Sequence, residues 1–216
     1  MIKRFLAGLM MAGLLVGGVS TASAAAFVEG KNYVRLDKPL PTRDKTRIEV
    51  IEFFWYGCIH CFHFEPTLKA WASKQADDVY LQGSPALWNK AMSLHAQAFY
   101  TAQALGVLDK LHEPLFAALN VEPKVKLNDE GDVEKFFVKH GVDKEAFRKT
   151  FNSFGVTSQV KQADARARTT GIEGTPEMLV NGRYRVSSRL AGGQSMEQML
   201  KVVDFLIEQE RAARGS

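Results

Sequence analysis

A buried strand that leads into a helix opened by two cysteines is the feature that most constrains this chain. Residues 47–55 form a near-continuous apolar run rich in β-branched and aromatic side chains, which is typical of a central strand covered on both faces. Gly57 permits a sharp exit from that strand, and Cys58-Ile59-His60-Cys61 then begins a helix predicted over 59–74. The chain has no other cysteines. The pattern predicts a thiol–disulfide site at a strand–helix junction.

The position of Cys58 favours its reactive form. The thiolate is the nucleophile, and a free cysteine with a pKa of about 8.5 is mostly protonated at neutral pH. In the first turn of a helix, unpaired backbone N–H groups and the positive end of the helix dipole both favour the anion. Cys61 lies on the same helical face, and His60 can add positive charge or a donor. A stabilised thiolate favours the reduced protein, so we expect the disulfide form to be a strong oxidant.

Residues 1–26 have the pattern of a secretory signal peptide. Lys3 and Arg4 precede an apolar run over 5–19, and small residues follow over 22–26 as a cleavage site. A membrane anchor is the alternative, but the apolar run is short and rich in glycine. Because this segment carries two basic residues and no acidic one, its removal lowers the net charge from +4 to +2. No dense basic run with interleaved aromatics is present, which argues against nucleic-acid binding.

Cysteine usage supports a redox role for Cys58 and Cys61. Exported proteins usually place cysteines in structural disulfides, but a bridge across so short a loop would constrain little of the unfolded chain. A metal site is the competing interpretation, because His60 and His63 lie nearby. Zinc needs four ligands, usually from two clusters, and no second cysteine pair exists. We interpret the scattered histidines as surface or satisfied core residues; they are His95, His112 and His140.

The remaining pattern predicts an α/β fold in which a helical segment interrupts a small sheet. Strands are expected over 27–36, 47–55 and 79–84, followed by helices over 89–105, 108–119, 132–140, 144–151 and 156–169. Strands return over 177–180 and 184–187, joined by the hairpin signal Asn181-Gly182, and Ser195 opens a last amphipathic helix. We therefore expect one sheet domain from 27–88 and 171–216, and an inserted helical domain over 89–170.

Two further positions have the character of site residues. Gly174-Thr175-Pro176 precedes a strand, and a proline there removes one ladder donor, which leaves backbone groups for another partner. The Pro176 bond is a candidate for the cis form, although a plain loop proline fits the position equally well. Glu52 lies inside the apolar strand, where burial would raise its pKa. It can relay protons to Cys61, or be a satisfied, water-linked acid at the strand edge.

Taken together, these residues resemble a known family. The segment Glu52-Phe53-Phe54-Trp55-Tyr56-Gly57-Cys58-Ile59-His60-Cys61, followed by Gly174-Thr175-Pro176, is similar to the thioredoxin-like periplasmic thiol:disulfide oxidoreductases of the DsbA family. The resemblance covers the mature chain, including the helical insertion and the Asn-Gly hairpin. One position departs from it, because familiar members carry proline where this chain has Ile59.

The resemblance implies roles for the site residues. Cys58 would form a mixed disulfide with a reduced, exported polypeptide and Cys61 would resolve it, with no cofactor beyond their own redox-active disulfide. His60 would be the main tuner of the Cys58 thiolate. Thr175-Pro176 would be a cis peptide that offers backbone groups to extended substrate, and Glu52 would be the buried acid below the dithiol. A quinone-linked membrane partner of the DsbB type would reoxidise the protein in the periplasm.

Other functions remain as alternatives at this point. A disulfide isomerase or reductase would use the same cysteines, but periplasmic isomerases of this superfamily are usually dimers with an N-terminal dimerisation domain. Only about twenty residues separate the predicted signal from the catalytic strand, so we expect a monomer without such a domain. A non-catalytic peptide-binding module and a metal carrier are the alternatives from other classes.

Overall fold

Five strands form one sheet at the centre of an α/β fold. The computed structural model describes residues 27–122, 125–191 and 195–215. Its strands are β1 (Val34–Arg35), β2 (Ile48–Phe54), β3 (Val79–Pro85), β4 (Glu177–Val180) and β5 (Tyr184–Ser187), in the spatial order β1-β5-β4-β2-β3. Strand β3 is parallel to β2, whereas β4 is antiparallel to both β2 and β5. Every residue of β2 is buried, which confirms the central strand predicted from its apolar run.

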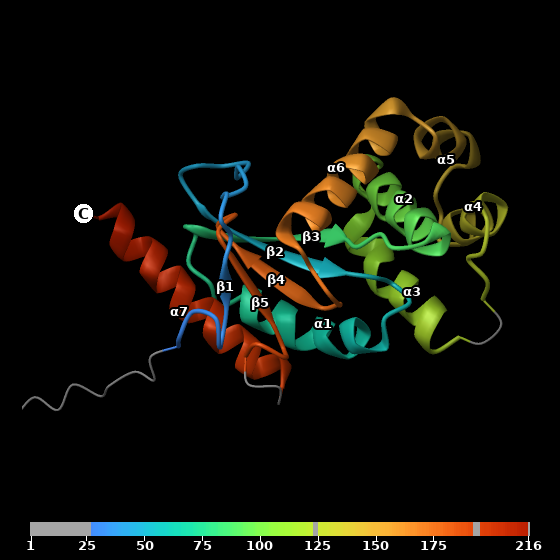
Figure 1. Ribbon diagram of the computed structural model, residues 1–216. Coiled ribbons are helices and arrows are strands. Elements are labelled where there is room, and N and C mark those ends of the chain that lie inside the picture. The colour runs from blue at the N-terminus through green and yellow to red at the C-terminus, as the bar shows by residue number, and fades with distance from the viewer. Residues whose placement is uncertain (1–26, 123–124, 192–194, 216) are drawn as a thin grey trace, which may run out of the picture.

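Helices cover both faces of the sheet (Figure 1). On one face, α1 (Ile59–Ala72) and α7 (Met196–Arg214) pack Phe64, Leu68 and Val203 against Ile48 and Val50 of β2. On the other face, Ala167 of α6 (Phe154–Thr170) packs with Ile51 and Phe53. Because side chains alternate along a strand, Glu52 shares the face of Ile48 and Val50 and lies on the side covered by α1.

A block of helices separates the two parts of the sheet in the sequence. It comprises α2 (Lys90–Ala104), α3 (Leu108–Asn120), α4 (Glu130–Lys139), α5 (Lys144–Phe151) and α6, all between β3 and β4. Phe54 and Tyr56, at the end of β2, pack into the aromatic core of this block beside Phe99 and Phe116. The inserted helical block is therefore confirmed, while the domain boundaries 27–88 with 171–216 and 89–170 stay a prediction.

Local sequence signals account for several element ends. Asp143 and Ser195 each cap a helix by accepting a hydrogen bond from the backbone amide of the third residue beyond. The β4–β5 hairpin turns at Asn181 and Gly182, which both have positive φ. Glycine is also required at position 182 by space, because a Cβ there would lie 2.1 Å from the Leu40 carbonyl oxygen.

The first strand is much shorter than the sequence predicts. The edge strand expected over 27–36 is present as β1, but its predicted length is wrong, since only Val34 and Arg35 pair with β5. The segment before them closes on itself, because the Asn32 amide donates to the Val28 carbonyl and the Gly30 amide to the Tyr33 carbonyl. Apolar residues alone do not distinguish such a turn from a strand.

The predicted signal peptide over 1–26 lies outside the described residues. Among the residues that are described, no helix is long and apolar enough to cross a membrane.

Candidate active site

The two cysteines lie where β2 gives way to α1. Cys58 is the N-cap residue of α1, with extended backbone angles, and its sulfur accepts a hydrogen bond from the Cys61 amide at 3.3 Å. Both cysteines are free thiols; Cys58 is partly exposed and Cys61 is buried. The predicted strand–helix junction is thus confirmed, and it presents only the first sulfur to solvent.

Hydrogen-bond donors around Cys58 lower its pKa from 9.0 to about 5. The largest contribution comes from the Cys61 thiol, which donates to the Cys58 sulfur, and burial opposes the shift. The Thr175 side chain and the backbone N–H groups of Cys61 and His60 stabilise the thiolate further. At neutral pH the exposed sulfur of the reduced protein is therefore a thiolate.

Cys61 has the opposite character. Its side chain is fully buried, and burial raises its pKa well above the ordinary value. Its hydrogen bond to Cys58 and the negative charges of Glu52 and Cys58 raise that pKa further. One thiol is thus a stable, accessible anion, and the other prefers to keep its proton.

The loop before β4 forms the opposite wall of the site. The Thr175–Pro176 peptide bond is cis, and the protonated Cys58 thiol donates to the Thr175 carbonyl at 3.3 Å. Sheet pairing produces this approach, because Glu177, the first residue of β4, lies opposite Phe53 near the end of β2. Residues 117 positions apart in the sequence are thereby brought into contact.

His60 contributes through its backbone rather than its ring. The side chain is exposed, and among the described residues it makes no hydrogen bond or ion pair. The donor that reaches Cys58 is the His60 amide. Ile59, at the position where the sequence departs from the family pattern, is also exposed.

A tryptophan connects the dithiol loop to the helical block. The Trp55 ring packs so closely on Gly57 that a Cβ there would lie 2.5 Å from it, so the glycine is needed for space. Trp55 Nε1 donates to His95 Nδ1 at 2.9 Å, which leaves His95 Nε2 to donate to the Leu127 carbonyl at 3.0 Å. Burial lowers the pKa of His95, so the ring remains a neutral link.

The remaining histidines of the helical block also have structural partners. His112 bonds to the Tyr56 hydroxyl at 2.8 Å through Nδ1 and to Glu65 through Nε2. His140 Nδ1 lies 2.8 Å from the Phe136 carbonyl oxygen. The interpretation of these side chains as satisfied residues is confirmed, and the described part of the chain contains no cluster of three metal-ligating side chains.

Glu52 lies beneath the dithiol as a buried, incompletely paired carboxyl. Only 3% of the residue is exposed, and its Oε1 has no hydrogen-bond partner among the described residues. Burial raises its pKa well above 4.5, with further contributions from the charges of Glu65 and Cys58. A cavity of about 470 Å³, lined also by Glu65, Gln82 and His112, lies beside it.

Glu177, which is not among the predicted site residues, holds the loop that contains Thr175 on the side away from Cys58. Its Oε1 accepts the Glu173 amide at 2.9 Å, and its Oε2 lies 3.8 Å from Arg185 Nε. The residue is buried, and burial raises the pKa of its carboxyl. An acidic residue directly after Pro176, at the start of a buried strand, is the signal that would have revealed it.

Comparison with known proteins identifies the family. A match to the family described as DSBA-like thioredoxin domain covers residues 74–204. The thiol:disulfide interchange protein DsbA of Azotobacter vinelandii is 40% identical over 99% of this chain and 100% of its own length. The chain belongs to the DsbA family. The protein of the same name from Pseudomonas aeruginosa is 42% identical over 89% of this chain and 90% of its own.

Solved structures of DsbA proteins have the same fold. The crystal structure of Pseudomonas aeruginosa DsbA covers 87% of this chain and 96% of its own, with 41% identity and a TM-score of 0.81. Oxidoreductase DsbA from Xylella fastidiosa covers 86% of this chain and 98% of its own, with 34% identity and a TM-score of 0.79. This member of the DsbA family is thus a thioredoxin-like thiol:disulfide oxidoreductase. Its redox group is its own disulfide, as in the family.

We predict that the thiolate absorbance of the reduced DsbA-family protein titrates with a midpoint near pH 5. Thr175→Val keeps the shape of the side chain but removes its hydroxyl. The midpoint should rise by about one unit, because a hydrogen bond to a charged group contributes about 1.5 kcal/mol. Thr169→Val, at an exposed position of α6, is the matched control and should leave the midpoint unchanged.

The lowered pKa of Cys58 also predicts how the folding stabilities of the reduced and oxidised forms depend on pH. The pKa of Cys58 is lower in the folded protein than in the unfolded chain. Between about pH 5 and 9 the unfolded chain therefore binds more protons. The stability that the thiolate adds to the reduced form should be fully present above pH 9 and be lost as pH falls toward 5. A midpoint near that of free cysteine, or an unfolding free energy difference between the two forms that is independent of pH, would contradict this assignment.

Proposed function

We propose that the mature protein is a periplasmic dithiol oxidase that passes the Cys58–Cys61 disulfide to reduced, newly exported polypeptides. The observation that carries this proposal is the lowered pKa of Cys58. Stabilising a thiolate in the reduced form favours reduction of the disulfide, which makes the oxidised protein a donor of disulfides. The signal pattern over 1–26 and membership of the DsbA family support the compartment.

The first step is attack on Cys58. A substrate thiolate attacks the Cys58 sulfur, the Cys58–Cys61 bond breaks, and a mixed disulfide forms while Cys61 leaves as a thiolate. Cys58 takes this role because its sulfur is exposed and Cys61 is fully buried. The Thr175 carbonyl beside Cys58 supports a backbone contact with extended substrate, and the His60 amide would donate to the Cys58 sulfur.

The second step completes the oxidation. A second substrate thiolate attacks the substrate sulfur of the mixed disulfide, the new substrate disulfide forms, and Cys58 leaves as the stabilised thiolate. Attack by Cys61 on the mixed disulfide would instead return the substrate to its thiol form. The role of Cys61 expected from the family resemblance therefore applies to the reverse direction, and the raised pKa of Cys61 disfavours that return.

Glu52 supplies the proton that Cys61 takes up. Burial raises the pKa of both groups, so a protonated Glu52 can transfer its proton to the departing Cys61 thiolate. The cavity beside Glu52 supports exchange of that proton with solvent. A membrane oxidoreductase of the DsbB type, linked to quinone, then restores the disulfide of the monomeric protein.

Two single-cysteine variants test the proposed roles. A peptide whose thiol is activated as a mixed disulfide with thionitrobenzoate should label Cys61→Ser rapidly and give a stable adduct at Cys58. Cys58→Ser should react at least about a hundredfold more slowly, because the remaining sulfur is buried and protonated. The released chromophore measures both rates, and mass spectrometry identifies the labelled residue. Comparable labelling rates for the two variants would contradict the assignment of Cys58 as the reactive sulfur.

Glu52→Gln tests the proton transfer. Mixed-disulfide formation by the oxidised variant should be about tenfold slower in single-turnover experiments, since positioned acids contribute at least that factor. The variant should also be more stable than the native protein above about pH 4.5. There the unfolded chain loses the Glu52 proton and the folded protein keeps it, so the native protein loses stability as pH rises.

A second buried carboxyl on the same strand provides the control. Glu49 lies on the other face of β2 and accepts a hydrogen bond from Tyr80, away from the cysteines. Glu49→Gln should leave the rate of mixed-disulfide formation unchanged. An unchanged rate in Glu52→Gln, or an equal decrease in both variants, would rule out the relay.

A further inference from the structure

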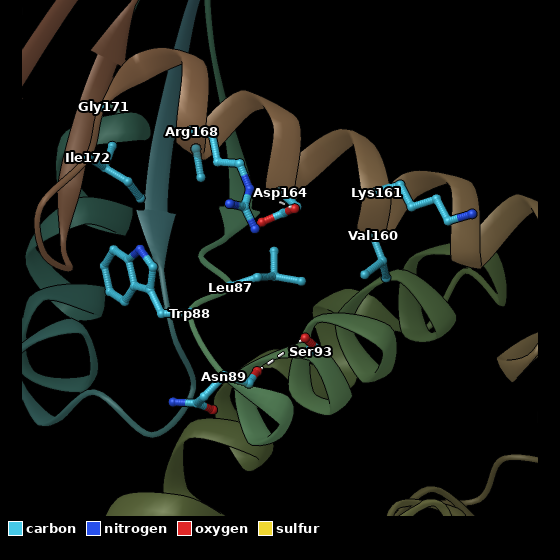
Figure 2. Close-up of a pocket in the computed structure, with 11 residues that line it drawn as sticks. Leu87, Trp88, Asn89, Ser93, Val160, Lys161, Asp164, Arg168, Gly171 and Ile172 are labelled. Carbon is cyan, nitrogen blue, oxygen red and sulfur yellow. Dashed lines mark hydrogen bonds and ion pairs between the residues drawn. The ribbon is translucent and has the colours of Figure 1, made fainter.

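The described residues contain a groove between α6 and the start of α2 that the disulfide chemistry does not use. It has a volume of about 690 Å³. Figure 2 shows Trp88 and Ile172 at one end, Lys161 at the other end along α6, and Leu87 between them. The groove is therefore elongated, with its walls supplied by two separate segments of the helical block.

One end of this groove is continuous with the wall of the dithiol site. Ile172 precedes Thr175 by three residues, and three residues of extended chain span about 10 Å at most. Trp55 provides a second connection, because it packs on Gly57 beside the cysteines and joins the apolar cluster that contains Ile172. A polypeptide held at Cys58 and extended along this loop reaches the groove about three residues from its reacting cysteine.

The end near the dithiol offers an apolar contact. Trp88 is 52% exposed, although it lies beside the buried side chains of Leu87 and Ile172. Tryptophan is one of the residue types enriched among the side chains that contribute most to binding at protein interfaces. A leucine-sized or aromatic side chain placed here would cover the indole ring and remove apolar surface from water.

The far end of the groove is positively charged. Asp164 and Arg168 neutralise each other in an ion pair of 3.0 Å. Lys161 is exposed and has no ion pair among the described residues, so it leaves the groove with one uncompensated positive charge. It lies nine residues before Thr170, where α6 ends beside Ile172, which is about 13 Å along the helix axis and about four residues of extended chain. An acidic side chain of a bound polypeptide would meet Lys161 there.

We propose that this groove is a second contact site for the reduced polypeptide substrate. It takes an apolar side chain against Trp88 about three residues from the reacting cysteine, and an acidic side chain at Lys161 about four residues farther on, on the same face of the extended chain. The proposal rests on the oxidase function given above and adds a preference among substrates. Small thiols react at Cys58 without reaching the groove.

Single-turnover oxidation of two-cysteine peptides by the full mature protein tests this proposal. One peptide series carries leucine three residues outside a cysteine and glutamate four residues beyond the leucine, either before the first cysteine or after the second. The reference peptide has serine at both positions. For one of these two placements, before the first cysteine or after the second, the leucine–glutamate peptide should react about tenfold faster than the reference peptide. Trp88→Ala should reduce that advantage to within twofold.

Control reactions separate the groove from the dithiol. Phe154→Ala removes an 87% exposed aromatic ring at the start of the same helix α6, outside the groove, and should keep the full advantage. Dithiothreitol should be oxidised at the same rate by every variant. Lys161→Glu should weaken the preference for glutamate and favour a peptide with lysine in its place.

Two results would contradict the proposed role of the groove in substrate binding while leaving the oxidase function intact. They are an equal rate for the leucine–glutamate and serine peptides, and an advantage that survives Trp88→Ala. Failure of the native protein to oxidise any peptide or dithiothreitol would refute both the oxidase function and the proposed substrate contact at the groove.

Discussion

The thiolate of Cys58 is the charge on which the site depends. Its sulfur lies at the N-cap of α1 and receives hydrogen bonds from the Cys61 thiol, the Thr175 side chain and backbone amides. Each of these donors stabilises the anion that exists only in the reduced protein. The same arrangement buries Cys61, so the two sulfurs of one short motif differ in both exposure and pKa. Disulfide donation follows from this difference, because the bond links a sulfur that gains stability on reduction to one shielded from substrate.

The rest of the fold holds the partners of that thiolate in place. Antiparallel pairing of β4 with β2 brings Thr175 to Cys58, and Glu177 fixes the intervening loop through the Glu173 amide. The helical block contributes from the other side, since His95 holds the Trp55 ring against the dithiol loop. The inserted helices therefore orient the active-site loop directly, and they also carry the groove beside α6 into which an extended substrate would reach.

Local pattern was sufficient to predict much of this site. The apolar run of β2, the cysteine spacing and the Asn181-Gly182 turn each report a short-range constraint, and the acid at position 52 stood out because charge is costly inside such a strand. Contacts between distant segments were not accessible in that way. The hydrogen bond from Trp55 to His95 joins segments with no characteristic spacing in the sequence. No sequence pattern predicts the hydrogen bond by which Glu177 holds the loop before β4. Likewise, the helix terminus predicted donors near Cys58, but only the structure distinguishes the His60 amide from its ring.

The equilibrium of the Cys58–Cys61 couple with glutathione measures how far the thiolate of Cys58 stabilises the reduced protein. Thioredoxin, whose reactive cysteine has a pKa of about 7, has a potential of about −270 mV. A Cys58 pKa of about 5 stabilises the reduced form by two further units, which corresponds to roughly 60 mV for a two-electron couple. We therefore expect a reduction potential that is more oxidising than that of thioredoxin by roughly 60 mV. A potential equal to or more reducing than that of thioredoxin would contradict the oxidase and indicate a reductase.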